Sequence, residues 1–235
     1  VQRDLQVSYN HLPDYINDLS AAIHTPYPPF AELGVKKDGA YQQMNANVLQ
    51  IENEYYGLIR PKQTIRRGEK PTQALKSRGI EYIEMRCVDL NPFDPIGIDR
   101  PTAHFLEVFA LHSLLSASPF FVNSEYAELA ERQERMVEQG RAPHLKLTID
   151  GQNNEFSVAA LAMLAEMQEV AKTLDNAHDT CRYSESISAQ IAKVQHPEQT
   201  YAAQALAQMK QHNNSFFAFG HAIAEQHRDF FLDRP

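Results

Sequence analysis

Cysteine is scarce in this sequence. Only Cys87 and Cys181 occur among 235 residues, and they lie far apart without forming a C-x-x-C pair. Disulfide scaffolds and cysteine-rich zinc modules are therefore excluded, and a reducing cytoplasm is the expected location. Glycine and proline together make up less than a tenth of the chain. This composition excludes collagen-like and linker-like chains.

Long apolar runs and excess positive charge are also missing. The longest apolar stretch, around Phe105 to Leu115, is interrupted by Glu107 and His112, so we expect no membrane-spanning helix. No charged n-region followed by an apolar h-region opens the sequence, so we expect no secretory signal. The formal net charge is −8, which argues against nucleic acid as a partner because phosphate contacts need a basic surface.

The fold class predicted from the patterning is α+β. A chain of this length can bury a core without disulfides or metals. Apolar residues at helical spacing predict helices at 13–23, 102–117, 125–139, 158–174, 186–194 and 201–210. Period-two alternation predicts strands at 45–59 and 79–90, and the turn at 36–39 predicts a hairpin or loop tip. We therefore expect a sheet-bearing part at 1–100 and a helical part at 101–235.

Glu84 and Arg86 form the sharpest local feature. Residues two apart on a strand lie about 6.6 to 6.8 Å apart on one face. A carboxylate and a guanidinium at this spacing can share one anionic ligand, the carboxylate through a hard cation such as Mg²⁺ and the arginine directly. The alternative is a cross-strand ion pair on a solvated sheet face, worth under about 1 kcal/mol. The tripeptide alone favours that alternative.

The segment Arg60 to Lys70 carries five of the 22 basic residues in an otherwise acidic chain. Such a loop suits a polyphosphate, although a merely solvated loop is the simpler interpretation. No aromatic residue lies among the charges, which weakens a nucleic-acid interpretation. Cys87 is expected to be a core thiol. Common hydrolase, nucleotide-loop and histidine-pair metal motifs are absent from the sequence.

Four segments in order resemble bacterial glutamate–cysteine ligase, the enzyme that makes γ-glutamylcysteine in the first step of glutathione biosynthesis. They are NANVLQIENEYY at 45–56, IRPK at 59–62, GIEYIEMR at 79–86 and DLNPF at 89–93. The resemblance is strong from about residue 4 to 99 and looser beyond. The strand with Glu84 and Arg86 also looks like its counterpart in glutamine synthetase, which shares this fold.

The resemblance implies a glutamine synthetase-like, mainly antiparallel active-site sheet followed by a helical region. It also implies ATP-dependent ligation of L-glutamate and L-cysteine through an acyl phosphate, with Mg²⁺ or Mn²⁺ as cofactor. Charge neutralisation by metal and arginine is the expected catalytic means. Two alternatives stay open, namely another carboxylate–amine ligase of the same fold and a non-catalytic binding or regulatory module.

The resemblance also assigns roles to individual residues. Glu84 matches a metal-binding glutamate, Arg86 matches the arginine on the transferred phosphoryl group, and Tyr56 matches the tyrosine that binds the cysteine carboxylate. We add Arg60 and Lys62 as phosphate contacts, on charge and location alone. The family's chains are longer, and their other metal-binding carboxylates precede the point that matches Val1. We therefore expect a C-terminal portion that lacks the N-terminal portion and is inactive alone.

Overall fold

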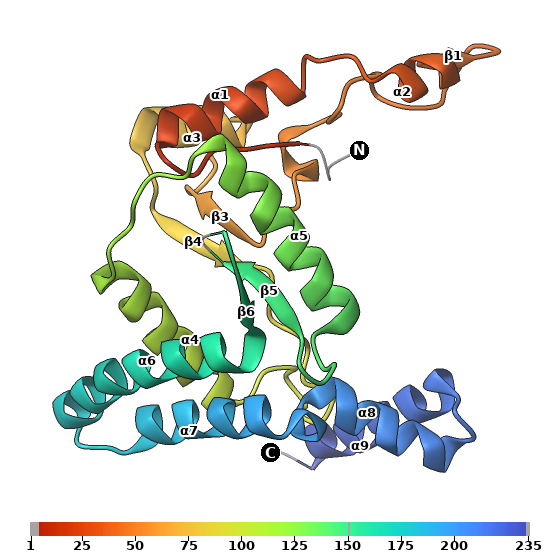
Figure 1. The fold of residues 1–235 in the computed structure, drawn as a ribbon. Coiled ribbons are helices and arrows are strands. Elements are labelled where there is room, and N and C mark those ends of the chain that lie inside the picture. Colours follow the sequence, from red (N-terminus) through yellow and green to blue (C-terminus); the bar gives the residue numbers. More distant parts are fainter. Residues whose placement is uncertain (1–4, 150, 234–235) are drawn as a thin grey trace. The chain divides into compact units, whose positions relative to one another are not determined.

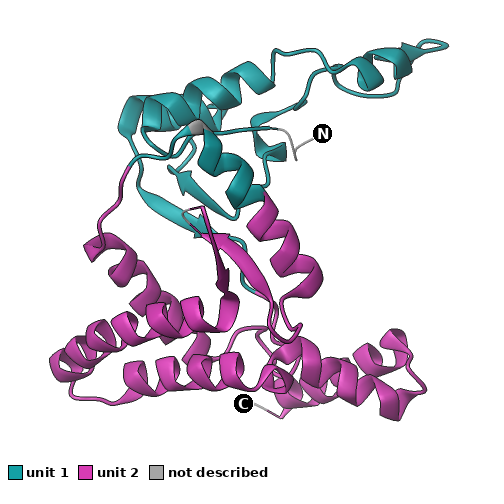
Figure 2. Cartoon of the chain, viewed as in Figure 1, with its two compact units in different colours: residues 1–88, 120–130 teal, residues 89–119, 131–235 magenta. Residues whose placement is uncertain are grey.

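The computed structural model describes residues 5–149 and 151–233 (Figure 1). Within this range the chain packs as two compact units (Figure 2). Unit 1 contains residues up to 88 together with 120–130, and unit 2 contains 89–119 together with the residues from 131 onward. The chain therefore leaves unit 1, returns to it and leaves it again. Among the described residues, no helix combines the length and hydropathy that crossing a bilayer requires.

Unit 1 is built from short elements. Its helices and strands are α1 (Leu12–Ala22), α2 (Pro28–Leu33), β1 (Lys36–Lys37), β2 (Ala40–Tyr41), a 3₁₀ turn (Glu52–Glu54), β3 (Ile59–Lys62), α3 (Pro71–Arg78), β4 (Tyr82–Met85) and the start of α5 (Asn123–Gln139). Strands β1 and β2 pair as an antiparallel hairpin. Helix α1 confirms the helix predicted at 13–23. Strands β3 and β4 are also antiparallel, with Arg60 directly opposite Glu84.

Unit 2 is mostly helical. Its elements are α4 (Arg100–Leu115), the remainder of α5, β5 (Lys146–Ile149), β6 (Gln152–Glu155), α6 (Phe156–His178), α7 (Arg182–Gln195), a 3₁₀ turn (Pro197–Gln199), α8 (Tyr201–Met209), a second 3₁₀ turn (Lys210–His212) and α9 (Phe216–Leu232). Helices α4 to α8 confirm the five predicted helical segments, and mixed helix and antiparallel strand confirms the α+β class. The β5–β6 hairpin and α9 were not predicted.

The predicted strand at 45–59 is wrong. Apart from the 3₁₀ turn at Glu52–Glu54, this segment is irregular until β3 begins at Ile59. Its polar side chains bond the neighbouring backbone, since Asn45 Oδ1 accepts from the Asn47 amide at 3.0 Å and Glu54 Oε2 accepts from the Gln50 amide at 2.6 Å. Such local bonds compete with a strand ladder. Residues do alternate in this segment, but the polar side chains form hydrogen bonds within turns.

The second predicted strand and the loop before it also need correction. Strand β4 covers only Tyr82–Met85 of the predicted 79–90. The region expected to be a loop contains β3 at one end and α3 at the other. Buried Glu52 caps α3, because its carboxylate accepts from the Thr72 amide at 2.8 Å and the Thr72 hydroxyl at 2.6 Å. Pro71 at the helix start and Gly79 at its end were signals for α3.

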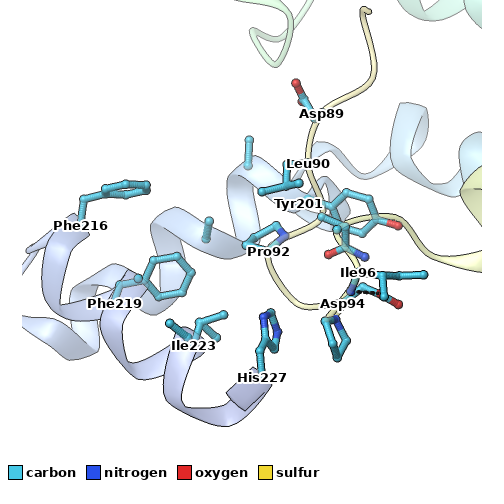
Figure 3. Close-up of a pocket in the computed structure, with 17 residues that line it drawn as sticks. Asp89, Leu90, Pro92, Asp94, Ile96, Tyr201, Phe216, Phe219, Ile223 and His227 are labelled. Carbon is cyan, nitrogen blue, oxygen red and sulfur yellow. Dashed lines mark hydrogen bonds between the residues drawn. The ribbon is translucent and has the colours of Figure 1, made fainter. Parts of the chain in front are cut away.

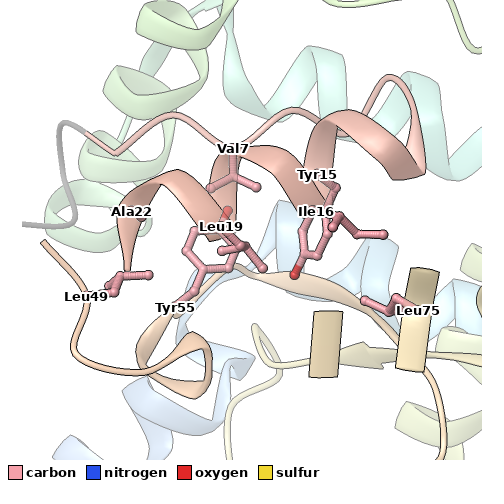
Figure 4. Packing of buried hydrophobic residues seen from close by; sticks show 8 residues of the cluster. All are labelled: Val7, Tyr15, Ile16, Leu19, Ala22, Leu49, Tyr55 and Leu75. Carbon is pink, nitrogen blue, oxygen red and sulfur yellow. The ribbon is translucent and has the colours of Figure 1, made fainter. Parts of the chain in front are cut away.

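The core of unit 1 lies beneath α1 (Figure 4). Tyr15, Ile16 and Leu19 project from one face of this helix, as its apolar spacing requires. They pack with Leu49 and Leu75 from the loop and α3, which are 1% and 3% exposed. Burying side chains of this size stabilises the fold by about 1.5 to 3 kcal/mol each. The core therefore fixes α1 above the segment that carries β3.

Asp175 gives unit 2 a testable pH dependence. Its buried carboxylate accepts from the Tyr183 and Ser184 amides at 2.9 Å each, which caps the start of α7. Burial raises its pKa, but these hydrogen bonds outweigh that effect and hold the pKa below its ordinary value. The stabilisation is therefore present above the unfolded pKa of about 3.9 and lost as pH falls through the lower folded value.

We expect Asp175→Asn to lower stability at pH 7 by about 1 to 3 kcal/mol, since hydrogen bonds to a charged group are lost. The difference from wild type should shrink below about pH 4. Chemical denaturation of both proteins at several pH values measures this difference. A difference independent of pH would contradict the assignment, and Asp179→Asn is the control on the exposed side of the same turn.

Candidate functional site

Three basic side chains surround the Glu84 carboxylate. Strand β3 supplies Arg60 and Lys62, which share one face because they are two residues apart. Lys62 Nζ lies 3.2 Å from Glu84 Oε2, and Arg60 Nε lies 4.0 Å from the same oxygen. Arg86, directly after β4, places its Nε 3.5 Å from Glu84 Oε1. We call these four residues the Glu84 cluster.

The charges of the Glu84 cluster do not cancel. Burial acts to raise the pKa of Glu84, while the close Lys62 ammonium, then Arg86 and Arg60, lower it below its ordinary value. The carboxylate is therefore ionised at neutral pH, and three cations against one anion leave an excess of positive charge. Such a surplus favours a phosphoryl or carboxylate ligand at this face.

Tyr56 lies beside the Glu84 cluster. The Arg86 guanidinium carbon is 5.3 Å from the centroid of the Tyr56 ring, within the range of a cation–π contact. The ring is 69% exposed, whereas the preceding Tyr55 is buried in the core of unit 1. The chain thus turns one tyrosine inward as an anchor and the next outward to solvent. The structure brings all five residues predicted for the site into one region of unit 1.

A complete metal site is not present in the described part of the chain. No group of three or more histidine, cysteine, aspartate or glutamate side chains gathers there. Glu84 offers hard oxygen donors of the kind that Mg²⁺ prefers, but the groups around it are cations. Glu84 therefore fits a metal as a single ligand at most, because the described residues around it form no group of ligands.

The rest of the basic segment points to solvent. Arg66, Arg67 and Lys70 are exposed, and the segment is held by Glu69, whose carboxylate receives two 2.7 Å hydrogen bonds from Arg78. The prediction of a core thiol at Cys87 is wrong, because Cys87 is exposed. It follows β4, a strand in which no residue is buried.

Three tyrosines of unit 1 that contact one another were missed; Tyr15 and Tyr55 are buried, and Tyr9 is 44% exposed. Tyr9, Tyr15 and Tyr55 form edge-to-face ring contacts, with ring centroids 5.6 Å apart for Tyr9 and Tyr15 and 6.2 Å apart for Tyr15 and Tyr55. Burial raises the pKa of Tyr15 to about 12, although Arg60 acts to lower it. Tyr55 stands inside the quoted segment 45–56, but nothing in the sequence joined it to residues 9 and 15.

A separate cavity of about 690 Å³ lies in unit 2 (Figure 3). It is bounded by the loop 89–97 and by α8 and α9, and its walls are mainly apolar. Leu90, Tyr201, Phe216, Phe219 and Ile223 line it. None of the residues predicted for the site borders this cavity. The sequence did not predict this cavity, because α9, which forms one of its walls, was not predicted.

The fold and the Glu84 cluster define a class of α+β protein with a group of basic side chains on a small antiparallel sheet. Comparison with known proteins narrows this class. A sequence model of the glutamate–cysteine ligase family matches residues 1–136, which is more than half of the chain, and the chain belongs to this family.

Individual relatives agree with this assignment. Glutamate–cysteine ligase from Pseudomonas entomophila is 42% identical over 234 residues, covering 100% of this chain and 44% of the relative. The Alcanivorax borkumensis protein of the same name is 43% identical, covering 98% and 45%. The chain thus spans less than half the length of the curated relatives it matches.

Two solved structures share the fold. Glutamate–cysteine ligase from Francisella tularensis, solved in complex with AMP, matches with a TM-score of 0.89 and 32% identity, covering 99% of this chain and 46% of that one. A bifunctional glutathione synthetase from Pasteurella multocida matches with a TM-score of 0.61 and 21% identity, covering 98% and 25%. The second match supports the fold alone, and the first confirms the expected fold class.

Proposed function

We propose that this chain supplies part of the active site of an ATP-dependent ligase that joins the γ-carboxylate of L-glutamate to the amine of L-cysteine. The observation that carries the proposal is the Glu84 cluster, with its surplus positive charge and with Tyr56 beside Arg86. Family membership and the AMP complex of the Francisella tularensis relative support a nucleotide substrate. Because the relatives are more than twice as long, the activity belongs to the complete protein.

The proposed reaction has two steps. The glutamate γ-carboxylate oxygen attacks the γ-phosphorus of ATP, the bond to the bridging oxygen breaks, and ADP leaves. The cysteine amine then attacks the acyl phosphate carbon, the carbon–oxygen bond to phosphate breaks, and the amine loses a proton as the amide forms. Both steps place negative charge on phosphoryl oxygens, so positioning and fixed positive charge are the main requirements.

The residues divide these tasks. Arg86 contacts the transferred phosphoryl group, since its planar guanidinium suits two phosphoryl oxygens at once. Lys62 and Arg60 are proposed phosphate contacts, and Tyr56 binds the carboxylate of cysteine through its exposed hydroxyl. Glu84 is proposed as one ligand of Mg²⁺ or Mn²⁺, which would neutralise phosphate charge when bound. We place this enzyme in the cytoplasm.

The test is an assay of the protein encoded by its complete reading frame. ADP release is measured with ATP and glutamate, first with cysteine and then with a panel of other amines. Cysteine-dependent ADP release with γ-glutamylcysteine as product is the expected result. Preference for another amine would indicate a different ligase of this fold, and no turnover with any amine would indicate a binding module. The polypeptide 1–235 alone should be inactive.

A Tyr56 variant tests the acceptor assignment. In the complete protein, Tyr56→Phe should raise KM for cysteine by roughly 10- to 150-fold, because one hydrogen bond to a charged carboxylate is worth about 1.5 to 3 kcal/mol. KM for ATP should stay near the wild-type value. Steady-state kinetics with each substrate varied in turn measures both constants. Tyr41→Phe is the matched control on the exposed β1–β2 hairpin, and a change confined to KM for ATP would refute the role of Tyr56.

A further inference from the structure

The apolar cavity of unit 2 has the size of a small-molecule pocket. Its volume is about 690 Å³, and pockets that enclose small ligands usually measure roughly 300 to 1,000 Å³. All of its walls belong to unit 2. Leu90, Ile96 and Phe216 border it and are 70% to 74% exposed, so the cavity opens to solvent on that side. Within the described residues, a molecule from solution can therefore reach it.

Two aromatic walls of this cavity are held in place by contacts within unit 2. Phe219 is 3% exposed and makes an edge-to-face contact with Phe93, with ring centroids 6.4 Å apart. Tyr201 donates its hydroxyl hydrogen to Asp99, and the Lys193 ammonium lies 4.1 Å from the centroid of the Tyr201 ring. One ordered ring thus comes from α9 and the other from the start of α8. Walls that are already ordered lower the entropic cost of binding a ligand.

The loop 89–97 forms a third ordered wall. Asn91 is 6% exposed, and its backbone amide donates to the Gly97 carbonyl at 2.8 Å. Its side-chain oxygen accepts from the Phe93 amide at 3.0 Å, and its side-chain nitrogen donates to Asp99 at 3.2 Å. These bonds close the loop on itself and join it to the start of α4, so the loop keeps its shape beside the cavity.

Gly220 leaves space on the face of α9 that borders the cavity. Phe216, Gly220, Ile223 and His227 recur at helical spacing and share this face, and Figure 3 shows the last two side chains opposite the loop. Glycine inside a helix is less stable than alanine. A Cβ atom at Gly220 would meet nothing within 4 Å apart from its chain neighbours and its own helix backbone. Packing against another segment therefore does not require glycine here, and a larger side chain would occupy the cavity.

The charged groups that border the cavity favour a cation. Asp89 and Asp94 belong to the loop wall, and Asp94 Oδ1 accepts from the Ile96 amide at 3.0 Å. No lysine or arginine is among the described residues that border the cavity. Two carboxylates without a basic side chain make the local potential negative, which attracts cations and repels phosphates and carboxylates. A second nucleotide therefore does not suit this cavity.

We propose that the cavity binds a small organic cation, namely an amine with an aromatic body. The rings of Tyr201 and Phe219 provide edges and faces for an aromatic ring. The carboxylates of Asp89 and Asp94 attract the ammonium group. The proposal does not rest on the ligase function, because none of the five residues of that site borders the cavity.

Two matched pairs of compounds test the proposal on the complete protein. Tryptamine and indole-3-propionate share a ring system but differ in charge, as do phenethylamine and 3-phenylpropionate. Isothermal titration calorimetry should show binding of an amine and about 10-fold or weaker binding of the matching carboxylate, because like charges repel. Binding of neither amine at millimolar concentration would overturn the proposal, and this is the result expected if another part of the complete protein covers the cavity. Equal binding of amine and carboxylate would also overturn it.

Variants of two walls locate the bound amine. Gly220→Leu should abolish binding because leucine fills the cavity, whereas Gln226→Leu adds the same side chain at an exposed position of α9 away from the cavity and should not. Asp94→Asn keeps an oxygen that accepts from the Ile96 amide but removes the charge, so affinity should fall by about 10-fold. Asp229→Asn removes a carboxylate of α9 that does not border the cavity, and affinity should stay at the wild-type value.

Thermal unfolding of the same variants separates binding from folding. Leucine is a better helix former than glycine, so Gly220→Leu should unfold at or above the wild-type temperature. If this variant unfolds far below that temperature, the comparison of Asp94→Asn with Asp229→Asn decides. Wild-type affinity in a folded Gly220→Leu protein or in Asp94→Asn would overturn the proposal. These measurements need no turnover, so a failure of the proposed ligase function would leave their outcome unchanged.

Discussion

Glu84→Gln and Arg86→Lys should each lower kcat of the complete protein by about 10²- to 10³-fold. That is the usual cost of removing one preorganised charge or donor from a reacting centre. The glutamine keeps the size of Glu84 but loses the charge that would hold Mg²⁺, so high magnesium should restore activity only in part. The lysine keeps the charge of Arg86 but loses the bidentate geometry that phosphoryl oxygens require.

Both variants should fold normally. The ion pair of Arg86 with Glu84 is partly exposed and contributes under about 1 kcal/mol, so Arg86→Lys should change the melting temperature by less than about 4 °C. Glu84→Gln should lower it further, because Arg60 is 4% exposed and loses its acidic partner. Measuring kcat and thermal unfolding on the same samples separates catalysis from stability. Glu81→Gln is the matched control for charge loss, because Glu81 bonds the Thr64 amide outside the cluster. Near-wild-type turnover in either variant would show that Glu84 and Arg86 form only a surface ion pair. A fall in melting temperature in proportion to the loss of kcat would show that their role is structural.

The polypeptide 1–235 produced alone should associate in solution. Strands β3 and β4 pair only with each other within the described residues, which leaves an unpaired edge on each. Apolar side chains around them are 45% to 52% exposed, namely Leu58, Ile80, Tyr82 and Ile83. Open edges beside apolar surface promote pairing between chains. Light scattering should give a mass well above 26.7 kDa at micromolar concentration, with strong binding of a hydrophobic dye.

A charge placed on this strand pair should reverse the association. Ile83→Lys adds a lysine to β4, the kind of side chain that blocks edge pairing. Leu33→Lys adds the same charge to an exposed position on α2, which is 68% exposed, and should leave association unchanged. A monomeric wild-type polypeptide with little dye binding would show that the strand pair is no interaction surface.

The helices were the predictable part of the fold. Their apolar residues recur at a spacing that few other structures satisfy, and Pro13 near the start of α1 marks its boundary. The segment 45–58 was not predictable from alternation. Its alternating polar residues bond turns, and only Glu52, reaching Thr72 twenty residues away, reveals why an acidic side chain is buried there. Contacts between distant segments leave no periodic signal.

The candidate residues of the site were predictable to a similar extent. Glu84 and Arg86 stand two residues apart, and the basic residues on β3 belong to a local excess of positive charge. Short segments of sequence were therefore enough to show the resemblance and to select these residues as candidates. The contact of Tyr15 with Tyr55 was not predictable, because Tyr15 lies 40 residues earlier in the chain and looks like any aromatic residue on the apolar face of a helix.

The alternation of the chain between the two units has a consequence for how the protein is made. Residues 120–130 belong to unit 1 but follow a stretch of 89–119 that belongs to unit 2. On a ribosome, unit 1 therefore cannot be completed when Arg86 emerges, and its strands wait until the start of α5 has been synthesised. Closing the long connection formed by residues 89–119 costs conformational entropy. Until it closes, the exposed β3–β4 pair is prone to aggregation with other chains. Cutting the gene after residue 88 would thus produce an unfinished unit 1.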